Sequence, residues 1–488
     1  MFAAGRIRVA IAPLAAIIAL AGCGDQNRPQ LTRAQLLDPA ACQQCHPQQY
    51  KDWSGSMHAY AAEDPVFIAM NRRAQRESGG AVGDFCVKCH APVAVLEGLT
   101  NNGTNVETLP AHLKGVTCFA CHAAAAVEGT HNNPLRLATD GSLFGPFANP
   151  AAGTPHRSSY SALFDVARPE SAFACGSCHD IVNQHGAAVE RTFLEWQESL
   201  FADLKVGQTC TRCHMSPTSG PAATNSTIVR DLRNHAFAGV DVALTPFPEM
   251  EAQRLRVQTL LDGTLSGTVC LTDDLKINAY LDNVGAGHSF PSGATSDRRL
   301  WVEVVAYVGP DVIFRSGVVP AGGSLSSIVD DPDLWVIRDC LRTADGTATH
   351  LFWEAATVDP PNLIAAPVKQ NIQDPKTFTR SHVKRVFPGA GALPAKPDRI
   401  TLRVFLKPIG DDILSDLVAS GDLAQTDADA MPTFQLGGLL EPIAEWTPEK
   451  ASRPLTDAVT RQQVFGCVST SVQFTTATDD AVSHARCE

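Results

Sequence analysis

The chain has 488 residues, with 39 Lys and Arg against 51 Asp and Glu, and a formal net charge of -12. An acidic surface argues against nucleic-acid binding and against basic patches that bind minerals. The length accommodates more than one domain. Eleven of the 15 cysteines lie before residue 214, so the cysteine-rich chemistry is confined to the first half of the chain.

The amino terminus predicts export. Arg6 and Arg8 precede the apolar run "VAIAPLAAIIALA", which is followed by small residues, so we expect a signal peptide over residues 1–22. The run "LAGC" resembles a bacterial lipobox, which implies cleavage before Cys23, acylation of that cysteine and a linker over residues 23–38. Gly24 stands where an inner-membrane retention signal would place Asp, and this favours the outer membrane. The alternative is an ordinary signal peptide and a soluble periplasmic product.

Five copies of Cys-x-x-Cys-His follow the linker. In each copy two thiols can form thioethers to a haem and the adjacent His can ligate the iron, which predicts five covalently bound haem c groups. Zinc sites also use Cys-x-x-Cys pairs but need no His directly after the second Cys. The motif residues are Cys42, Cys45, His46; Cys86, Cys89, His90; Cys118, Cys121, His122; Cys175, Cys178, His179; and Cys210, Cys213, His214.

Residues 39–245 should form a pentahaem domain of short helices and much loop, because Gly, Ala, Asn and Pro separate the motifs. Five macrocycles would supply much of its apolar interior. One stretch, 187–204, has apolar residues at helical spacing and predicts a helix. We interpret its Glu190, Thr192, Glu195 and Trp196 as packing and hydrogen-bonding groups.

Residues 250–448 have a different pattern. Short β-branched or aromatic segments, separated by Gly, Pro and Asp, predict an antiparallel all-β domain resembling a sandwich. The expected strands lie within 275–284, 298–309, 311–319, 349–358, 378–387 and 399–408. Residues 449–488 form a tail of weak periodicity.

Four cysteines are in neither the haem motifs nor the lipobox. An even number in an exported chain suggests two disulfides, with three connectivities open. We favour Cys467 with Cys487, which would hold the tail, and Cys270 with Cys340. Free buried thiols are the alternative.

Several runs around the motifs resemble the cytochrome c-554 type of multihaem cytochrome. They are "CQQCHPQQYKDWSGSMHAYA", "GVTCFACH" followed by "GTHNN", and "CGSCHD", "ERTFLEW", "GQTCTRCHM" and "HAFAG" in succession. The resemblance covers about residues 40–240. It implies that His58 is a distal ligand of a haem other than the one it follows, that His131 is also a distal ligand, and that haems stack in close pairs. The fifth motif and the β-rich extension depart from the tetrahaem type.

A second resemblance concerns the β-rich half. The run "NVGAGHSFPSGATSDRRLW" is similar to a Gly-His-x-x-Pro-x-Gly segment of multihaem cytochromes with such a domain, which implies that His288 is a distal ligand; the alternative is a turn in which His288 only packs. His156 and His235 lie in loops where no periodicity requires a His. The predicted distal ligands are therefore His58, His131, His156, His235 and His288. His112 and His185 are the substitutes, and surface or core roles suit His350, His382 and His484 better.

These features predict an electron-transfer protein that exchanges electrons with other redox proteins in the periplasm or at the outer membrane. Two imidazoles on every iron would close all five to small molecules. The alternative is an oxidoreductase with one open iron acting on a small nitrogen or sulfur compound, and we consider an enzyme the less favoured reading. If one iron is open, the resemblance points to the haem of His90. The β domain could also serve as a docking module.

Overall fold

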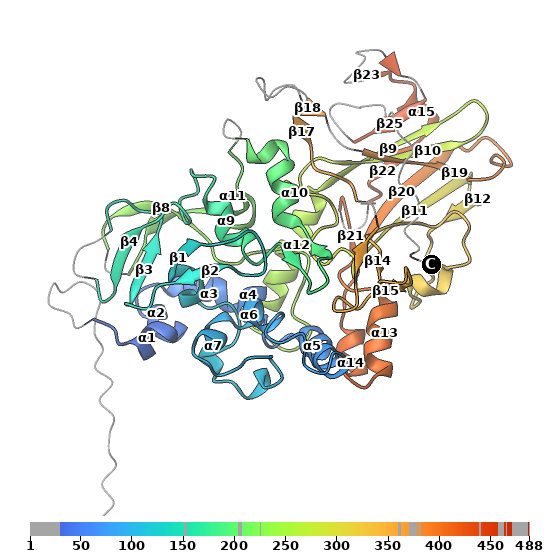
Figure 1. Ribbon diagram of the computed structural model, residues 1–488. Coiled ribbons are helices and arrows are strands. Elements are labelled where there is room, and N and C mark those ends of the chain that lie inside the picture. Colours follow the sequence, from blue (N-terminus) through green and yellow to red (C-terminus); the bar gives the residue numbers. More distant parts are fainter. Residues whose placement is uncertain are drawn as a thin grey trace, which may run out of the picture.

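The computed structural model describes residues 30–150, 154–203, 207–224, 226–359, 363–369, 378–379, 382–438, 441–456, 463–464, 466–470 and 487. The predicted signal peptide and Cys23 lie outside them, as does His484. Figure 1 shows two regions side by side: short helices and hairpins in the blue to green half of the chain, and long strands in the yellow to red half.

The first region is built from short helices joined by loops. Prolines begin several of them, because the missing N–H of proline costs nothing in the first helical turn. Asp38 caps α2 and Asp64 caps α5, each through a side-chain oxygen that accepts a backbone N–H. The helices are α1 Arg33–Leu37, α2 Pro39–Gln43, α3 Pro47–Ser54, α4 Met57–Tyr60, α5 Pro65–Glu77, α6 Val87–His90, α7 Pro92–Leu96, η1 Val106–Thr108, η2 Ala111–Leu113, α8 Cys118–His122, α9 Ser171–Gly176, α10 Thr192–Glu198, η3 Leu200–Ala202 and α11 Cys210–His214.

Four two-stranded sheets complete this region, and all except the parallel β3–β4 pair are antiparallel. They are β1 Ala124–Val127 with β2 Leu135–Leu137, β3 Ser142–Gly145 with β4 Arg157–Tyr160, β5 Ile181–Val182 with β6 Ala188–Glu190, and β7 Pro217–Pro221 with β8 Val229–Arg233. The helix predicted over 187–204 forms only from Thr192, because Ala188–Glu190 pairs with the strand that follows the fourth motif.

The second region begins with α12 Met250–Asp262, and its two largest sheets are antiparallel. One has the order β19 His382–Phe387, β10 Ile277–Asn283, β9 Leu265–Leu271 and β25 Cys467–Ser469. The other has β12 Asp311–Ser316, β11 Arg299–Val308, β20 Arg399–Lys407 and β21 Phe434–Gln435, with β13 Trp335–Ile337 on β11 and β22 Ala444–Trp446 on β20. The antiparallel sheets agree with the predicted fold class.

One hydrophobic core joins the two sheets. Alternate residues of β11 and of β20, from Leu300 to Ala306 and from Ile400 to Leu406, point into it. Val269 of β9 and Leu281 of β10 enter it from the other sheet, and both are fully buried. The two sheets therefore share one apolar interior.

The prediction of an all-β region is wrong in two respects. Helices α12, α13 Asp411–Ala419, α14 Gln425–Asp429 and α15 Pro448–Ala451 belong to it. The predicted strand 349–358 is mostly turn, because Leu351 and Trp353 are buried by packing rather than by sheet pairing. The remaining short elements are η4 Leu325–Ile328, β14 Leu341–Arg342, β15 Ala348–Thr349, β16 Thr357–Val358, β17 Val368–Lys369, β18 Phe378–Thr379, β23 Leu455–Thr456 and β24 Gln463–Val464.

Two disulfides join pairs of described cysteines, and they show that the favoured pairing is wrong. Cys270 is bonded to Cys467, and Cys340 is bonded to Cys487. The reason for the first is sheet register: β25 pairs with β9 so that Cys467 lies directly opposite Cys270. Both bonds therefore connect the end of the chain to the body of the second region.

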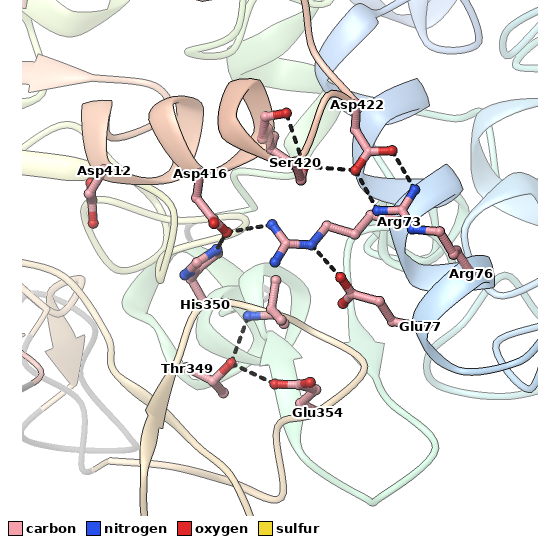
Figure 2. A network of polar contacts seen from close by, with 12 residues as sticks. Arg73, Arg76, Glu77, Thr349, His350, Glu354, Asp412, Asp416, Ser420 and Asp422 are labelled. Carbon is pink, nitrogen blue, oxygen red and sulfur yellow. Dashed lines mark hydrogen bonds and ion pairs between the residues drawn. The ribbon is translucent and has the colours of Figure 1, made fainter.

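A polar network and an apolar contact hold the two regions together (Figure 2). Arg73 on α5 binds Asp416 on α13 and, through Nε, Glu77 at 2.7 Å. Arg76 binds Asp422 through two hydrogen bonds of 2.6 Å. Beneath these ion pairs, apolar residues of α5 and α13 share one buried cluster. Among the described residues, no helix is long and apolar enough to cross a bilayer.

Candidate haem-binding site

In the structure, four of the predicted distal histidines lie opposite proximal histidines. The pairs are His46 with His156, His58 with His179, His122 with His235, and His214 with His288. In all four pairs the ring centroids are 6.3 Å apart. A metal held between two imidazoles, with metal–nitrogen bonds of about 2 Å, requires a centroid separation of about 6 Å. The equal spacing therefore fits an iron between each pair.

Hydrogen bonds prepare four of the five proximal imidazoles for ligation. Their Nδ1 atoms lie 2.6–2.8 Å from backbone carbonyl oxygens, so Nδ1 must carry the proton and Nε2 keeps its lone pair for a metal. The bonds run from His46 to Ala222, from His90 to Ala61, from His122 to Phe144 and from His214 to Ala238.

The fourth proximal residue, His179, has a different acceptor. Its Nδ1 lies 3.3 Å from Oε1 of Glu190. Burial disfavours the charged imidazole, but the hydrogen bond and negative charge of Glu190 raise the pKa of His179 to about 9. Among the proximal histidines, His179 alone thus donates to a carboxylate.

The four distal imidazoles are held neutral. Burial lowers the pKa of His58 to about 3 and the pKa values of His156, His235 and His288 to about 4. A neutral imidazole is the form that ligates a metal, so desolvation favours ligation at all four positions. His288 comes from the β-rich region and faces His214 of the fifth motif, so this pair spans both regions.

One short segment, residues 235–241, connects three of the sites. His235 is itself a member of one pair, the ring of Phe237 packs 4.5 Å from His58, and the carbonyl of Ala238 accepts from His214. Phe237 has a φ of 46°, a left-handed conformation that is uncommon for a bulky residue and persists only where the surroundings hold it. Asp241, the last residue of the segment, forms an ion pair with Arg298, which directly precedes β11 of the second region.

The motif cysteines form one connected set. The thiols of Cys42 and Cys118 are close enough to shift each other's pKa, as are those of Cys89 and Cys178 and those of Cys175 and Cys210. The thiol of Cys121 interacts electrostatically with Cys175 and Cys178. The fourth motif therefore adjoins the second, third and fifth, and the third adjoins the first.

Nine motif cysteines carry free thiols, as attachment of haem requires: Cys42, Cys86, Cys89, Cys118, Cys121, Cys175, Cys178, Cys210 and Cys213. The remaining motif cysteine, Cys45, is disulfide-bonded. The donor set of thiols and paired neutral imidazoles otherwise fits haem c.

The fifth predicted distal ligand, His131, is not brought to a proximal imidazole. Its side chain is exposed, and Nδ1 lies 3.0 Å from the hydroxyl of Thr130. The neighbouring Asn133 bonds to the carbonyl of Lys88, within the second motif. His90 of that motif instead stacks on Phe67 of α5, with ring centroids 3.9 Å apart and an interplanar angle of 4°. Ligation by all five predicted distal histidines remains a prediction.

The other histidines have different settings. His112 and His185 are exposed, and His350 binds Asp416 through Nε2 at 2.8 Å in the network of Figure 2. His382 begins β19. The backbone carbonyls that accept from the proximal imidazoles were not predictable, because any residue can supply one.

Residues 41–123 match the family described as cytochrome c554 and c-prime. The fold also resembles the crystal structure of a penta-heme cytochrome c552 from Thermochromatium tepidum, with a TM-score of 0.55 over 84% of this chain and 98% of that chain. The chain is therefore similar to multihaem c-type cytochromes in sequence over its first three haem motifs and in fold over most of its length. At 18% identity the structural match shows a shared fold, and no curated protein sequence matches this chain.

Proposed function

We propose that this cytochrome carries five haem c groups and transfers electrons between other redox proteins. The observation that supports this most strongly is the set of four imidazole pairs, each with ring centroids 6.3 Å apart. Two imidazoles occupy both axial positions of an iron and leave none for a substrate. Bound haem c supplies a one-electron iron couple, while the chain supplies ligands, spacing and exclusion of water.

The contacts between motifs support the same function. Electron transfer requires closely spaced centres, and every motif has at least one cysteine that interacts with a cysteine of another motif. The first motif connects through the third to the fourth, where the second and fifth also meet. This arrangement gives a branched path with more than one end at which partners could exchange electrons.

Haem content and spin state test this proposal together. Purified protein should contain five haems per chain, and the oxidised form should show low-spin ferric signals from at least four of them. Cyanide and nitric oxide should leave those four signals unchanged, because both axial positions are filled. Fewer than four low-spin haems would contradict the proposal.

We also propose that acylated Cys23 anchors the protein to the periplasmic face of the outer membrane. The support is the lipobox-like run and Gly24. Two or more acyl chains give stable anchoring, whereas one chain binds only marginally. Replacing Cys23 with Ser should move the protein from the outer-membrane fraction to the soluble periplasmic fraction without changing its haem content. Equal membrane retention of both forms would contradict the anchor.

A second candidate function rests on the second motif. Among the described residues, His90 faces no other imidazole and is covered on one side by Phe67. An iron with one protein ligand has an open position, and open positions are typical of catalytic metal sites. A high-spin ferric signal that cyanide or nitric oxide removes would support a haem enzyme acting on a small nitrogen or sulfur compound. Five low-spin signals would exclude it.

A further inference from the structure

The fourth motif differs from the other four in two independent ways. It is the junction of the set, since its cysteines adjoin those of three other motifs. It is also the motif whose proximal imidazole donates to a side-chain carboxylate instead of a backbone carbonyl. A charged acceptor on a ligand imidazole increases the electron donation of that imidazole to the metal.

The local fold places Glu190 for this contact. The strand β5 begins two residues after His179, and the strand β6 returns antiparallel to it, with Ile181 opposite Glu190. The hairpin thus brings the carboxylate back to the imidazole that precedes it by 11 residues. The side chain of Glu190 is 13% exposed, whereas that of His179 is 52% exposed.

Two arginines, one next to Glu190 in the chain and one that interacts with it electrostatically, form ion pairs with other carboxylates. Arg191, the next residue, pairs with Asp180 at 3.1 Å, and Arg298 pairs with Asp241 through bonds of 2.6 and 2.8 Å. Within the described part of the chain, no Lys or Arg forms an ion pair with Glu190. The hydrogen-bond partner of Glu190 is His179. The negative charge acts on His179 through a hydrogen bond, and on His90 and His288 only through space.

We propose that Glu190 is a positioning residue that lowers the reduction potential of the haem attached at the fourth motif. The inference rests on the proposed function, because it requires a haem between His179 and His58. A hydrogen bond to a carboxylate increases the basicity of His179, which stabilises ferric iron relative to ferrous iron. Electrons that pass among the haems of the second, third and fifth motifs would cross the haem of the fourth motif. Its lower reduction potential would therefore slow their transfer, and Glu190 would set its rate.

The test is Glu190→Gln in the intact cytochrome, followed by a redox titration monitored by optical and electron paramagnetic resonance spectra. Gln keeps the size and a carbonyl acceptor but removes the charge. One of the five midpoint potentials should become more positive, with at least a tenfold change in the ferric-to-ferrous ratio at fixed potential, or 59 mV for one electron. Glu190→Asp, which retains a charge, should restore part of the difference.

Glu195→Gln is the matched control. Glu195 lies on the adjacent helix α10 and its carboxylate accepts from the backbone N–H of Ser289 and the hydroxyl of Ser292, at 3.2 and 2.7 Å. Burial raises the pKa of Glu195 to about 7, so in titrations above that pH Glu195→Gln removes a nearby negative charge that has no hydrogen bond to an imidazole. The haem of the fourth motif should keep its potential in this variant.

The outcomes separate this inference from the proposed function. Five haems in the wild type with no shift in Glu190→Gln would contradict only the role of Glu190, as would equal shifts of the same haem in both variants. Loss of a haem from Glu190→Gln would show that Glu190 is needed for assembly, which also contradicts a tuning role. Fewer than five haems in the wild type would contradict the proposed function itself.

Discussion

The two regions of the molecule obtain their interiors in different ways. The β-rich region has a continuous side-chain core across two sheets, with many apolar residues fully buried. The first region has a smaller cluster centred on residues such as Val87, Val93 and Phe119, and its middle is lined by histidines and cysteines. We infer that haem c completes the interior of the first region, whereas side chains alone form the interior of the second.

The largest effect is expected from removing the haem of the third motif, which tests whether the two regions have separate interiors. Replacing Cys118 and Cys121 with Ser should abolish one haem and make residues 30–245 strongly susceptible to protease, because the lost macrocycle leaves unfilled apolar space. The second region should remain resistant. Limited proteolysis with mass spectrometry would measure both; equal loss of the two regions would contradict separate interiors.

The matched control removes two cysteines from the other region. Replacing Cys270 and Cys467 with Ser deletes the disulfide between β9 and β25 and should lower the stability of that region by about 2–5 kcal/mol. The haem content should remain unchanged. Loss of haem from this variant would show that attachment depends on the β-rich region more than the comparison allows.

A core substitution should affect the second region alone. Leu402 of β20 is fully buried between the two sheets. Leu402→Ala should reduce the free energy of unfolding by about 2–5 kcal/mol, since it removes apolar contacts and leaves a cavity. Denaturant titration by tryptophan fluorescence measures this loss, while haem absorbance should be unaffected at denaturant concentrations below the transition.

The stability of the second region should also depend on pH. Burial raises the pKa of Asp297 to about 7, although Arg299 and Arg298 oppose the shift. The folded state thus prefers the protonated carboxyl, so this contribution to stability is complete below the ordinary pKa near 4 and is lost as the pH rises through 7. Asp297→Asn should be more stable than wild type above pH 7, by on the order of 2 kcal/mol, and equal at pH 4. A variant that is less stable above pH 7 would contradict the direction of this shift.

The smallest expected effect lies at the boundary between the regions. Arg76 is 52% exposed, and its ion pair with Asp422 belongs to the network of Figure 2. Exposed ion pairs contribute about 0–1 kcal/mol, so Arg76→Ala should leave both the unfolding curve and the haem spectra almost unchanged. A loss of several kcal/mol would mean that this network, rather than the apolar contact beneath it, holds the regions together.

Sequence patterns predicted some features better than others, for physical reasons. The five motifs and the strands around Leu300 and Leu402 were predictable, because local spacing alone defines them. The disulfide between Cys270 and Cys467 depends on which strand lies beside β9, which no local pattern records. The same limit applies to the pairing of His58 with His179, which only the resemblance to known cytochromes indicated in part.

Glu190 shows a further limit. Its sequence context indicated a packing or hydrogen-bonding residue, and the structure gives the partner, His179. Nothing in the sequence distinguishes this carboxylate from Glu195, which lies five residues later in the chain and accepts hydrogen bonds from serines. Glu190 reaches His179 only because β6 pairs antiparallel with β5.

The most direct test of the account is the electron paramagnetic resonance spectrum of the oxidised protein and of its His288→Ala variant. The wild type should contain at least four low-spin haems with two imidazole ligands. In the variant one of these should become high-spin, because His214 loses the imidazole that faces it across 6.3 Å, while the other three remain. Fewer than four low-spin haems in the wild type, or an unchanged spectrum in the variant, would contradict the paired-imidazole account.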